Sequence, residues 1–280
     1  MGAIRRYRSH GLNISQLVAS IRRHPQMIRR FQRPMGVYLV TGASKGIGRS
    51  VALLLAEHGH QVILLARDSK ELGATLALVK KSSVDSFSLP CDLASPSQIS
   101  ESAQNLVNSI EGLDGLVHNA GSIHPVQPMM DANVSQWARS IQVNLIGVQD
   151  LTQRLFPLLK GPQHSRVTTI SSGASLRPVG SWSAYCTAKA GLDMWARCMA
   201  EEGKVHNISA ISVAPGIVNT GMQEDIRAAD PADFPSHEAF VSYHTDGHLA
   251  EPDDVASLLY PLITEHTMEQ SGQRFDVRDL

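Results

Sequence analysis

A phenol, an ammonium and a hydroxyl lie close together in the sequence between Ser172 and Lys189. Tyr185 and Lys189 are four residues apart in a segment with helical spacing, so they share one face of a helix. Ser172 precedes Tyr185 by thirteen residues and follows a run typical of a strand, 167–170. The three groups can therefore converge at the carboxyl end of a strand, where open α/β sheets bind their ligands.

These groups suit the reduction of a carbonyl to an alcohol, which needs a proton for the developing alkoxide. A free tyrosine has a pKa of about 10, and a neighbouring ammonium favours its phenolate. The Ser172 hydroxyl can hydrogen-bond the substrate oxygen and hold it for transfer. Two alternatives stay open: a Tyr and a Lys on an ordinary helix face, and Ser171 as the rival of Ser172. The spacing from Tyr185 favours Ser172.

A glycine-rich turn, 41–48, separates a short apolar strand from a helix. The strand is expected at 37–40 and the helix at 49–58. In this context glycines let the backbone approach a pyrophosphate, and the helix N-terminus offers free N–H groups. The turn therefore predicts a dinucleotide site with the binding residues Gly42, Ser44, Lys45, Gly46, Ile47 and Gly48.

Arg67 is the first polar residue after the second expected strand, 62–66, where a dinucleotide fold reads the adenosine ribose. A guanidinium binds a 2′-phosphate there, whereas an acid binds the 2′,3′-diol and repels the phosphate. Lys45 can add a second positive charge. This pattern favours NADP(H) over NAD(H), and the alternative is that both cations are merely solvated.

Strands alternate with helices along the chain, which predicts an α/β fold with a doubly wound parallel sheet of the Rossmann type and helices on both faces. Asp68, three residues before Glu71, is expected to cap the second helix. The polar segment 222–249 is expected to form a lid over a pocket or a plain surface excursion. The remaining strands are expected at 84–89, 115–118, 208–213 and 275–277, and the remaining helices at 69–80, 96–110, 134–159 and 252–265.

Several strand ends hold further candidates. Asp92 follows the third strand, where it can accept from an adenine amino group. Asn144 lies within the helix expected at 134–159, and a buried Asn needs partners, so it either satisfies local backbone or holds a water. The strand expected at 115–118 ends in the small residues Asn119, Ala120 and Gly121, and the strand expected at 208–213 is followed by a tight bend with Pro215 and Gly216. Both features permit close approach of a cofactor.

The composition excludes several functional classes. The 280 residues suffice for one large α/β domain, and a formal net charge of −1 gives no field that would demand nucleic acid or a membrane. No apolar run approaches the roughly 20 residues of a membrane span. The three cysteines form no C-x-x-C pair, which favours a reducing compartment such as the cytoplasm. His244 and His248 lack a third ligand in register, so no metal site is expected.

Residues 1–34 differ in composition from the domain expected at 35–280. An Arg-rich, acid-poor and amphipathic extension is typical of a mitochondrial transit peptide, so the mitochondrion is an alternative to the cytoplasm. The other interpretations are a disordered or surface-packed basic arm with no targeting role and a helix that lies on anionic lipid. No acid precedes Glu57, and the arginines are Arg5, Arg6, Arg8, Arg22, Arg23, Arg29, Arg30 and Arg33.

Taken in order, these motifs resemble those of the short-chain dehydrogenase/reductases over residues 35–276. The turn 41–48 is similar to the family's cofactor loop, and residues 119–121 are similar to the end of its N-N-A-G motif, whose first Asn is His118 here. That departure affects local sheet hydrogen bonding more than catalysis. The tail 272–279 resembles the sepiapterin reductase-like and benzil reductase-like branch. The residues that resemble the family's catalytic tetrad are Asn144, Ser172, Tyr185 and Lys189.

The resemblance implies a role for each of these residues. Tyr185 would act as acid and base, Lys189 would hold the nicotinamide ribose and lower the tyrosine pKa, and Ser172 would orient the carbonyl. Asn144 would anchor a water of a proton relay. An Arg at the position of Arg67 is typical of members that prefer NADP. The resemblance also implies assembly as a homodimer or homotetramer, and it places two residues near the nicotinamide carboxamide, Val218 and Thr220.

The sequence therefore predicts an NADPH-dependent carbonyl reductase that acts on a small-molecule ketone or aldehyde, with Tyr185 as the proton donor. One alternative is an alcohol dehydrogenase working oxidatively on a sterol or polyol. Another is a catalytically idle NADP-binding interaction protein, against which the complete tetrad argues. The identity of the substrate is beyond the sequence.

Overall fold

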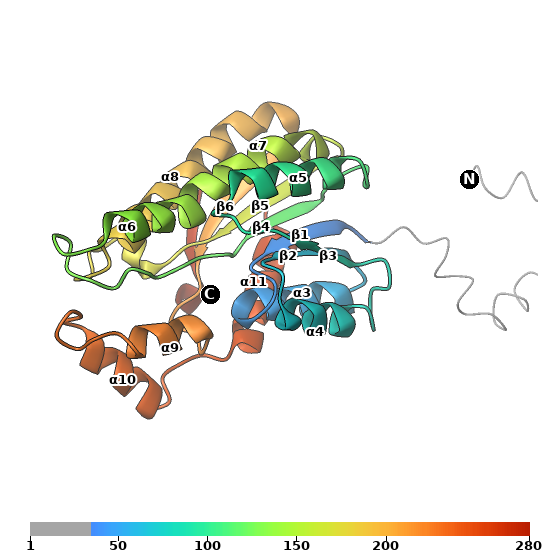
Figure 1. The fold of residues 1–280 in the computed structure, drawn as a ribbon. Helices are drawn as coiled ribbons and strands as arrows, with labels where there is room; N and C mark the ends of the chain where they lie inside the picture. Colours follow the sequence, from blue (N-terminus) through green and yellow to red (C-terminus); the bar gives the residue numbers. More distant parts are fainter. Residues whose placement is uncertain (1–34) are drawn as a thin grey trace, which may run out of the picture. The chain divides into compact units, whose positions relative to one another are not determined.

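The described part of the chain, residues 35–280 in this computed structural model, contains one sheet of seven parallel strands. Their order is β3-β2-β1-β4-β5-β6-β7, so the strand order reverses between β1 and β4. This confirms the predicted doubly wound parallel sheet (Figure 1). The predictions for residues 1–34 lie outside the described residues. The strands are β1 (Val37–Thr41), β2 (Gln61–Ala66), β3 (Phe87–Pro90), β4 (Gly115–His118), β5 (Ser165–Ile170), β6 (Ile208–Ala214) and β7 (Arg274–Asp276).

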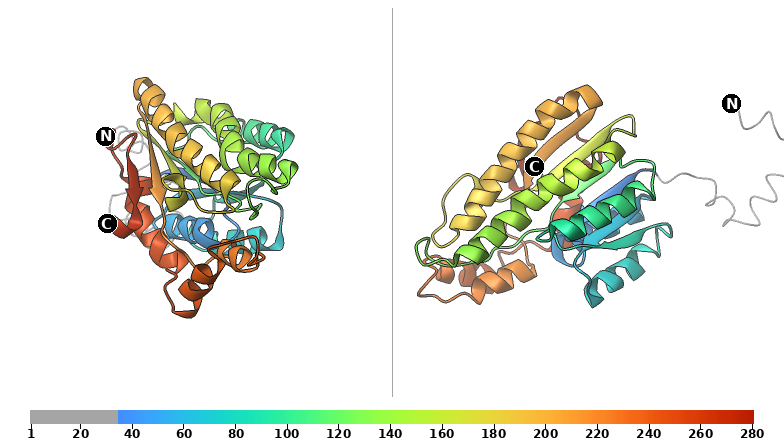
Figure 2. Two further views of the ribbon diagram at one scale, coloured as in Figure 1. Left: turned by 90° about the vertical axis from the view of Figure 1, so that its left-hand side faces the viewer. Right: turned by 45° about the horizontal axis from the view of Figure 1, so that its top comes forward.

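Helices cover both faces of the sheet. The views in Figures 1 and 2 place α5, α7 and α8 on one face and α3, α4 and α11 on the other, while α9 and α10 lie beyond one end of the sheet. The helices are α3 (Gly46–Glu57), α4 (Lys70–Val79), α5 (Pro96–Val107), α6 (Val134–Ile141), π-helix η2 (Gln142–Ile146), α7 (Gly147–Leu159), α8 (Ser183–Gly203), α9 (Gly221–Arg227), α10 (His237–Thr245) and α11 (Pro252–Thr264).

The apolar runs of the central strands are buried on both faces, as a parallel sheet between two helical layers requires. Neighbours along a strand face opposite layers: Leu39 and Leu116 pack with α5 and α7, whereas Val40 and Val117 pack with α3 and α11. Each such side chain contributes about 1.5–3 kcal/mol on burial. The two apolar layers therefore hold the strands in register, and all their carboxyl ends meet at one edge.

Several expected elements differ from the observed ones, among them β3, which spans Phe87–Pro90 rather than 84–89. α3 begins at Gly46 rather than at residue 49, because Lys45 is extended and leads directly into the first turn. The helix expected at 134–159 is interrupted by the π-helical turn η2, which contains the buried Asn144. The segment 222–249, expected as a lid or a plain surface excursion, contains most of α9 and all of α10.

The prediction that Asp68 caps the second helix is wrong. The backbone of Ser69 is extended, and its hydroxyl accepts a hydrogen bond from the Leu72 N–H at 3.2 Å, so Ser69 is the N-cap of α4. An Asp68 cap would start the helix at residue 69, whereas α4 starts at Lys70. Serine is as good an N-cap residue as aspartate, so Ser69 can take this role. Ser95 is the N-cap of α5, since its hydroxyl accepts from the Gln98 N–H.

Candidate active site

The fold brings Ser172, Tyr185 and Lys189 together at the carboxyl end of β5. Tyr185 lies in the first turn of α8 and Lys189 in the second, and the Lys189 Nζ donates to the Ile170 carbonyl at 2.7 Å. The same Nζ is 5.7 Å from the centre of the Tyr185 ring. The Ser172 hydroxyl lies close enough to the Tyr185 phenol to act on its pKa. The phenol, the hydroxyl and the ammonium thus lie together, as the spacing predicts.

Burial decides the protonation of this pair. It raises the pKa of Tyr185 to about 12, although the Ser172 hydroxyl acts in the opposite direction. Burial also lowers the pKa of Lys189 to about 8, and the nearby Asp193 carboxylate partly opposes that shift. The direction for Tyr185 is opposite to the lowering that the family resemblance implies, because removal of the phenolate from water outweighs the effect of the Ser172 hydroxyl. The phenol is therefore protonated at neutral pH, in the form that donates a proton.

Of the two rival serines, Ser172 is the one whose hydroxyl faces Tyr185. Its hydroxyl also accepts from the Ala174 N–H at 3.2 Å, at the start of a short 3-10 helix, Gly173–Ser175. The Ser171 side chain is buried, and its hydroxyl has no hydrogen-bond partner among residues 35–280. The geometry agrees with the choice of Ser172 from spacing.

Asn144 is fully buried in η2, and its amide pairs with local groups. The Nδ2 donates to the Ser122 and Ser140 carbonyls, each at 2.9 Å, and the Oδ1 accepts from the Ser122 N–H at 3.1 Å. A Cβ on Gly121 would lie 2.9 Å from that oxygen. Of the two predicted roles, the structure shows the one in which Asn144 satisfies local backbone, and this holds the segment after β4 in place.

His118, at the end of β4, is buried next to α7 and α8. Its Nε2 lies 2.8 Å from the Thr152 hydroxyl, and its ring meets Trp195 edge-on with centroids 5.7 Å apart. Because the Thr152 hydroxyl donates to the Val148 carbonyl, it accepts from the imidazole. Burial, with the Lys189 charge second, lowers the pKa of His118 to about 3. The histidine is therefore a neutral packing residue that ties β4 to α7.

The glycine turn after β1 presents backbone with no room for side chains. Gly42 and Gly46 have positive φ angles of 66° and 56°, and a Cβ on Gly48 would lie 2.4 Å from the Gly42 carbonyl oxygen. The Thr41 hydroxyl accepts from the N–H groups of Asn119 and Ala120, both at 3.0 Å. These contacts fasten the turn to the end of β4 and leave a cradle that suits a dinucleotide pyrophosphate.

Asn119 supports this cradle from the β4 side, because its amide donates to the Thr41 carbonyl at 2.9 Å. Ser44 and Ile47 are held by structural contacts: the Ser44 carbonyl accepts from the Thr75 hydroxyl, and Ile47 packs on the core. The Ile47 side chain is thus taken up by the core, whereas the contact of Ser44 occupies only its backbone carbonyl.

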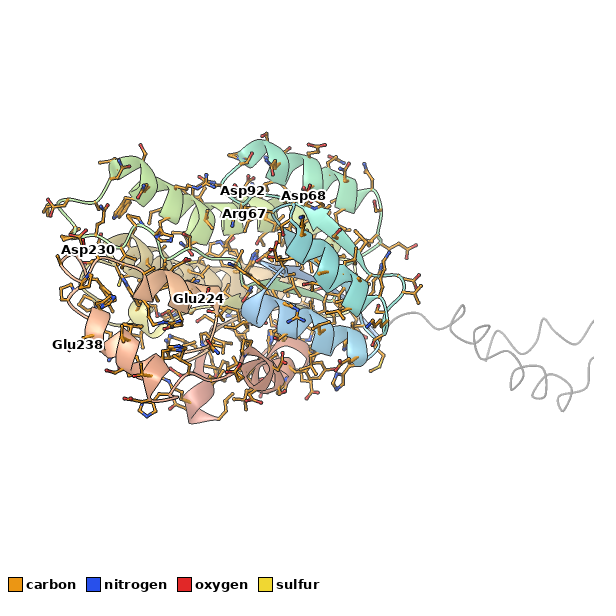
Figure 3. The ribbon with its side chains drawn as sticks, turned by 60° about the horizontal axis from the view of Figure 1, so that its bottom comes forward. Arg67, Asp68, Asp92, Glu224, Asp230 and Glu238 are labelled. Carbon is orange, nitrogen blue, oxygen red and sulfur yellow. The ribbon has the colours of Figure 1, made fainter. Side chains whose placement is uncertain are left out.

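Arg67 and Asp92 follow the neighbouring strands β2 and β3, and Figure 3 shows them on the same side of the molecule. Arg67 is exposed and forms no ion pair within residues 35–280. Asp92 already has partners, since one carboxylate oxygen accepts from the Ala94 N–H and the other pairs with Arg139, each at 2.9 Å. The free guanidinium fits a phosphate ligand, whereas the Asp92 carboxylate also holds its own loop.

The bend after β6 comes back to the glycine turn. Gly216 has a φ of 77°, and Val218 is buried and bridges to Ala250. Thr220 then begins α9, and its methyl group lies 3.1 Å from where a Cβ on Gly46 would stand. Pro215 precedes this bend directly after β6. The predicted carboxamide-binding residues thus lie beside the predicted pyrophosphate turn.

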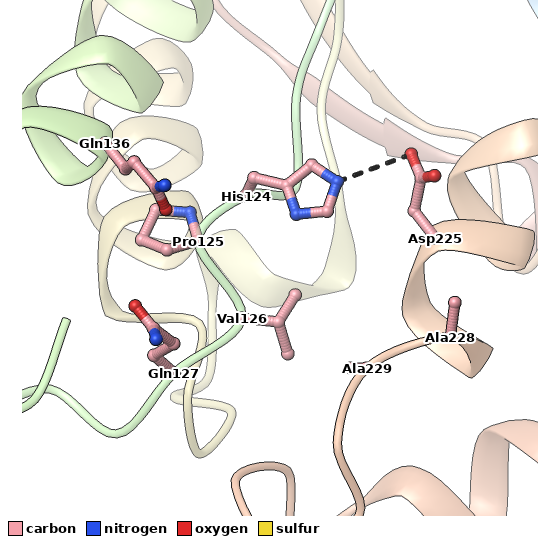
Figure 4. A pocket seen from close by; sticks show the side chains of 8 residues that line it. All are labelled: His124, Pro125, Val126, Gln127, Gln136, Asp225, Ala228 and Ala229. Carbon is pink, nitrogen blue, oxygen red and sulfur yellow. Dashed lines mark ion pairs between the residues drawn. The ribbon is translucent and has the colours of Figure 1, made fainter. Parts of the chain in front are cut away.

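A pocket of about 260 Å³ opens between the segment after β4 and α9 (Figure 4). At its mouth the His124 Nε2 faces the Asp225 carboxylate at 3.7 Å, and both side chains are more than half exposed. Val126 lines the pocket and also belongs to the apolar cluster that contains Tyr185 and Trp182. Nothing in the sequence spacing indicated Gln127, Gln136 or Asp225 as pocket residues.

Residues 36–231 match the family model described as short chain dehydrogenase. The chain belongs to the short-chain dehydrogenase family. This short-chain dehydrogenase is 32% identical to a benzil reductase ((S)-benzoin forming) from Bacillus subtilis, over 88% of its own length and 99% of that relative. The predicted family is confirmed, as is the predicted similarity to the benzil reductase-like branch.

Two further relatives bear on the cofactor of this short-chain dehydrogenase. It is 30% identical to an NADPH-dependent pterin aldehyde reductase from Arabidopsis thaliana, over 65% of this chain and 74% of that relative. A short chain dehydrogenase from Shigella flexneri, solved in complex with NADP, is 26% identical with a TM-score of 0.76, covering 88% of this chain and 98% of that one. Within residues 35–280 none of the helices has the length and apolar content that crossing a bilayer requires.

His118 offers a test of the buried site through pH. Its pKa of about 3 in the folded chain lies below the value of about 6.5 for an unfolded histidine. Between these values the unfolded chain binds the proton, so stability falls as the pH falls, by up to about 1.4 kcal/mol per pH unit. We expect His118→Asn to lose stability less steeply than the wild type between about pH 6.5 and pH 4, as measured by urea denaturation.

The control for this test is His206→Asn, which replaces an exposed histidine and should keep the wild-type slope. Parallel slopes for His118→Asn and the wild type would contradict a neutral, buried imidazole at this position.

Proposed function

We propose that this protein is an NADPH-dependent carbonyl reductase. The observation that supports it is the grouping of the Tyr185 phenol with the Ser172 hydroxyl and the Lys189 ammonium, in a domain whose glycine turn fits a dinucleotide. Bound NADPH supplies the hydride that reaches the carbonyl carbon. The relatives named as benzil reductase and as NADPH-dependent pterin aldehyde reductase support the same reaction class.

In this proposal the Tyr185 phenol donates the proton that the developing alkoxide needs. Its pKa of about 12 keeps it protonated before the reaction, in the form that donates a proton. The Ser172 hydroxyl holds the substrate oxygen next to that proton. The Lys189 ammonium has three N–H donors, and one of them binds the Ile170 carbonyl. The other two can hydrogen-bond the cofactor ribose and take part in returning a proton to the phenol. The anchoring of a relay water by Asn144 stays a prediction.

The residues proposed to hold the cofactor divide by the part of NADPH that they face. The glycine turn with Gly42, Gly46 and Gly48 holds the pyrophosphate, and Asp92 accepts from the adenine amino group. Arg67, with Lys45, binds the 2′-phosphate. Val218 and Thr220 face the carboxamide, and the remaining proposed contacts are Ser44, Ile47, Asn119, Ala120, Gly121, Pro215, Gly216, Tyr185 and Lys189.

The substrate is proposed to be a small ketone or aldehyde that enters through the pocket of Figure 4. The apolar floor at Val126 adjoins the Tyr185 cluster, while Gln127, Gln136 and Asp225 make the rim polar. Aromatic diketones such as benzil are the first compounds to test, because the Bacillus subtilis relative is named as a benzil reductase.

Replacing Tyr185 by Phe tests the reaction. We expect kcat with NADPH and a reducible diketone to fall by about 100-fold or more, because the proton donor is lost while the ring still fills its place. NADPH binding, followed by fluorescence titration, should stay within about twofold of the wild type. Tyr260→Phe is the matched control, because it removes a phenol that is bonded to His60. Unchanged turnover in Tyr185→Phe would refute the role.

Replacing Arg67 by Ala tests the choice of cofactor. Loss of one charge-assisted contact of about 1.5–3 kcal/mol should raise the KM for NADPH about ten- to hundredfold. The KM for NADH should hardly change, because NADH has no 2′-phosphate. Arg197→Ala, an exposed arginine on α8, serves as the control and should alter neither constant. Equal effects on both cofactors would defeat the assignment of Arg67.

We also propose a homodimer or homotetramer that assembles through the long helices. Ile146 and Met194, in η2 and α8, are large apolar side chains that are 49% and 54% exposed. Met194→Glu should lower the mass measured by analytical ultracentrifugation, since a carboxylate cannot be buried there without a partner. Val205→Glu, at an exposed apolar residue after α8, should leave the mass unchanged. A wild type that sediments as a monomer would contradict the assembly.

For the compartment we propose the cytoplasm, with the mitochondrion as the alternative through the Arg-rich residues 1–34. Fluorescence microscopy of tagged chains with and without residues 1–34 distinguishes the two, because only a targeting segment changes the location when it is removed.

A further inference from the structure

Arg274, on the edge strand β7, reaches across the sheet to the candidate active site. Its Nε donates to the Asp193 carboxylate at 3.1 Å, and a terminal NH2 group donates to the Ser172 backbone carbonyl at 3.1 Å. Both side chains of the ion pair are mostly buried, with exposed fractions of 22% and 13%. One planar guanidinium thus joins α8 to the loop that bears the catalytic serine.

Asp193 lies on the same face of α8 as the catalytic pair, since it follows Lys189 by four residues and Tyr185 by eight. Its second carboxylate oxygen is buried without a hydrogen-bond partner among the described residues. Its charge acts on Lys189 and raises the lysine pKa against the effect of burial. The other ionisable side chains in the surroundings of Lys189 are Tyr185 and His118, and burial keeps both of them neutral.

We propose that Arg274 is a positioning residue of this active site. Its guanidinium holds the Ser172 backbone against the face of α8 that bears Tyr185 and Lys189, and it keeps the Asp193 carboxylate from pairing with the Lys189 ammonium. This inference rests on the proposed reductase function of the same site.

The two bonds of Arg274 have different consequences. Without the guanidinium, Asp193 is a buried carboxylate without a cation, and the nearest ammonium is drawn toward it and away from the Ile170 carbonyl. Ser172 keeps two donors on its carbonyl, the Ser175 hydroxyl at 2.8 Å and the Ser175 N–H at 3.1 Å, so its loop stays folded. The loss is therefore one of alignment, and a displacement of about 1 Å can cost on the order of 100-fold in rate.

The test compares Arg274→Met with the wild type, using NADPH and benzil. We expect kcat to fall about 10- to 100-fold, while NADPH affinity, measured by fluorescence titration, stays within about twofold. The alkaline limb of the kcat profile, which lies near pH 8 if Lys189 must be protonated, should move to higher pH in Arg274→Met. In Asp193→Asn it should move to lower pH, because the charge that raises the lysine pKa is gone.

Two further variants sharpen the result. Arg274→Lys keeps the positive charge but lacks the fork that reaches both partners, so it should restore the position of the alkaline limb and only part of kcat. If Arg274→Met does not bind NADPH, the kcat of Arg274→Lys is compared with that of the wild type instead. Arg154→Met breaks a similar arginine–aspartate pair with Asp150 on α7 and should behave as the wild type.

The outcomes separate the two claims. If the wild type oxidises no NADPH with benzil, other aromatic diketones or quinones, the proposed function is overturned and the role of Arg274 with it. If the wild type is active and Arg274→Met keeps its kcat and its alkaline limb, the positioning role alone is overturned. A loss of kcat with no shift of the limb in either Arg274→Met or Asp193→Asn also overturns it, because a merely structural effect gives that pattern.

Discussion

The hydrogen bond from the Lys189 ammonium to the Ile170 carbonyl connects the fold to the chemistry of the site. A buried ammonium is costly unless oxygen partners replace its water, and the carbonyl that ends β5 is such a partner. This contact requires the N-terminal half of α8 to dock at the carboxyl end of β5. Tyr185 is then one helical turn from the ammonium, and Ser172, two residues beyond the strand, faces the phenol.

A second set of contacts joins the opposite half of the sheet to the same edge. Where the strand order reverses, the Thr41 hydroxyl and the Asn119 amide bind the end of β1 to the end of β4. The turn between β1 and α3 is thereby held so closely that a Cβ on Gly48 would collide with backbone. The binding surface for a dinucleotide at this point is the backbone itself, and the glycines are needed because any larger residue would displace it.

The pocket proposed for the substrate is built differently. Thr220, the residue before α9, lies close to the glycine turn, so the start of α9 is tied to the proposed cofactor site. Farther along, Asp225 meets His124 through an exposed ion pair that solvent screens strongly. The packed apolar cluster around Tyr185 therefore adjoins a rim held by weak contacts.

The sequence by itself determined the parallel doubly wound sheet, the glycine turn and the grouping of Ser172 with Tyr185 and Lys189, because hydrophobic period and helical spacing are local properties. It failed at the cap of α4, where Ser69 competes with Asp68, and it left two roles open for the amide of Asn144. Only the tertiary structure decided the pKa values of Tyr185 and Lys189, since burial depends on chain segments far apart in sequence. The same holds for Arg274, which lies 81 residues from Asp193 and meets it only because β7 completes the sheet.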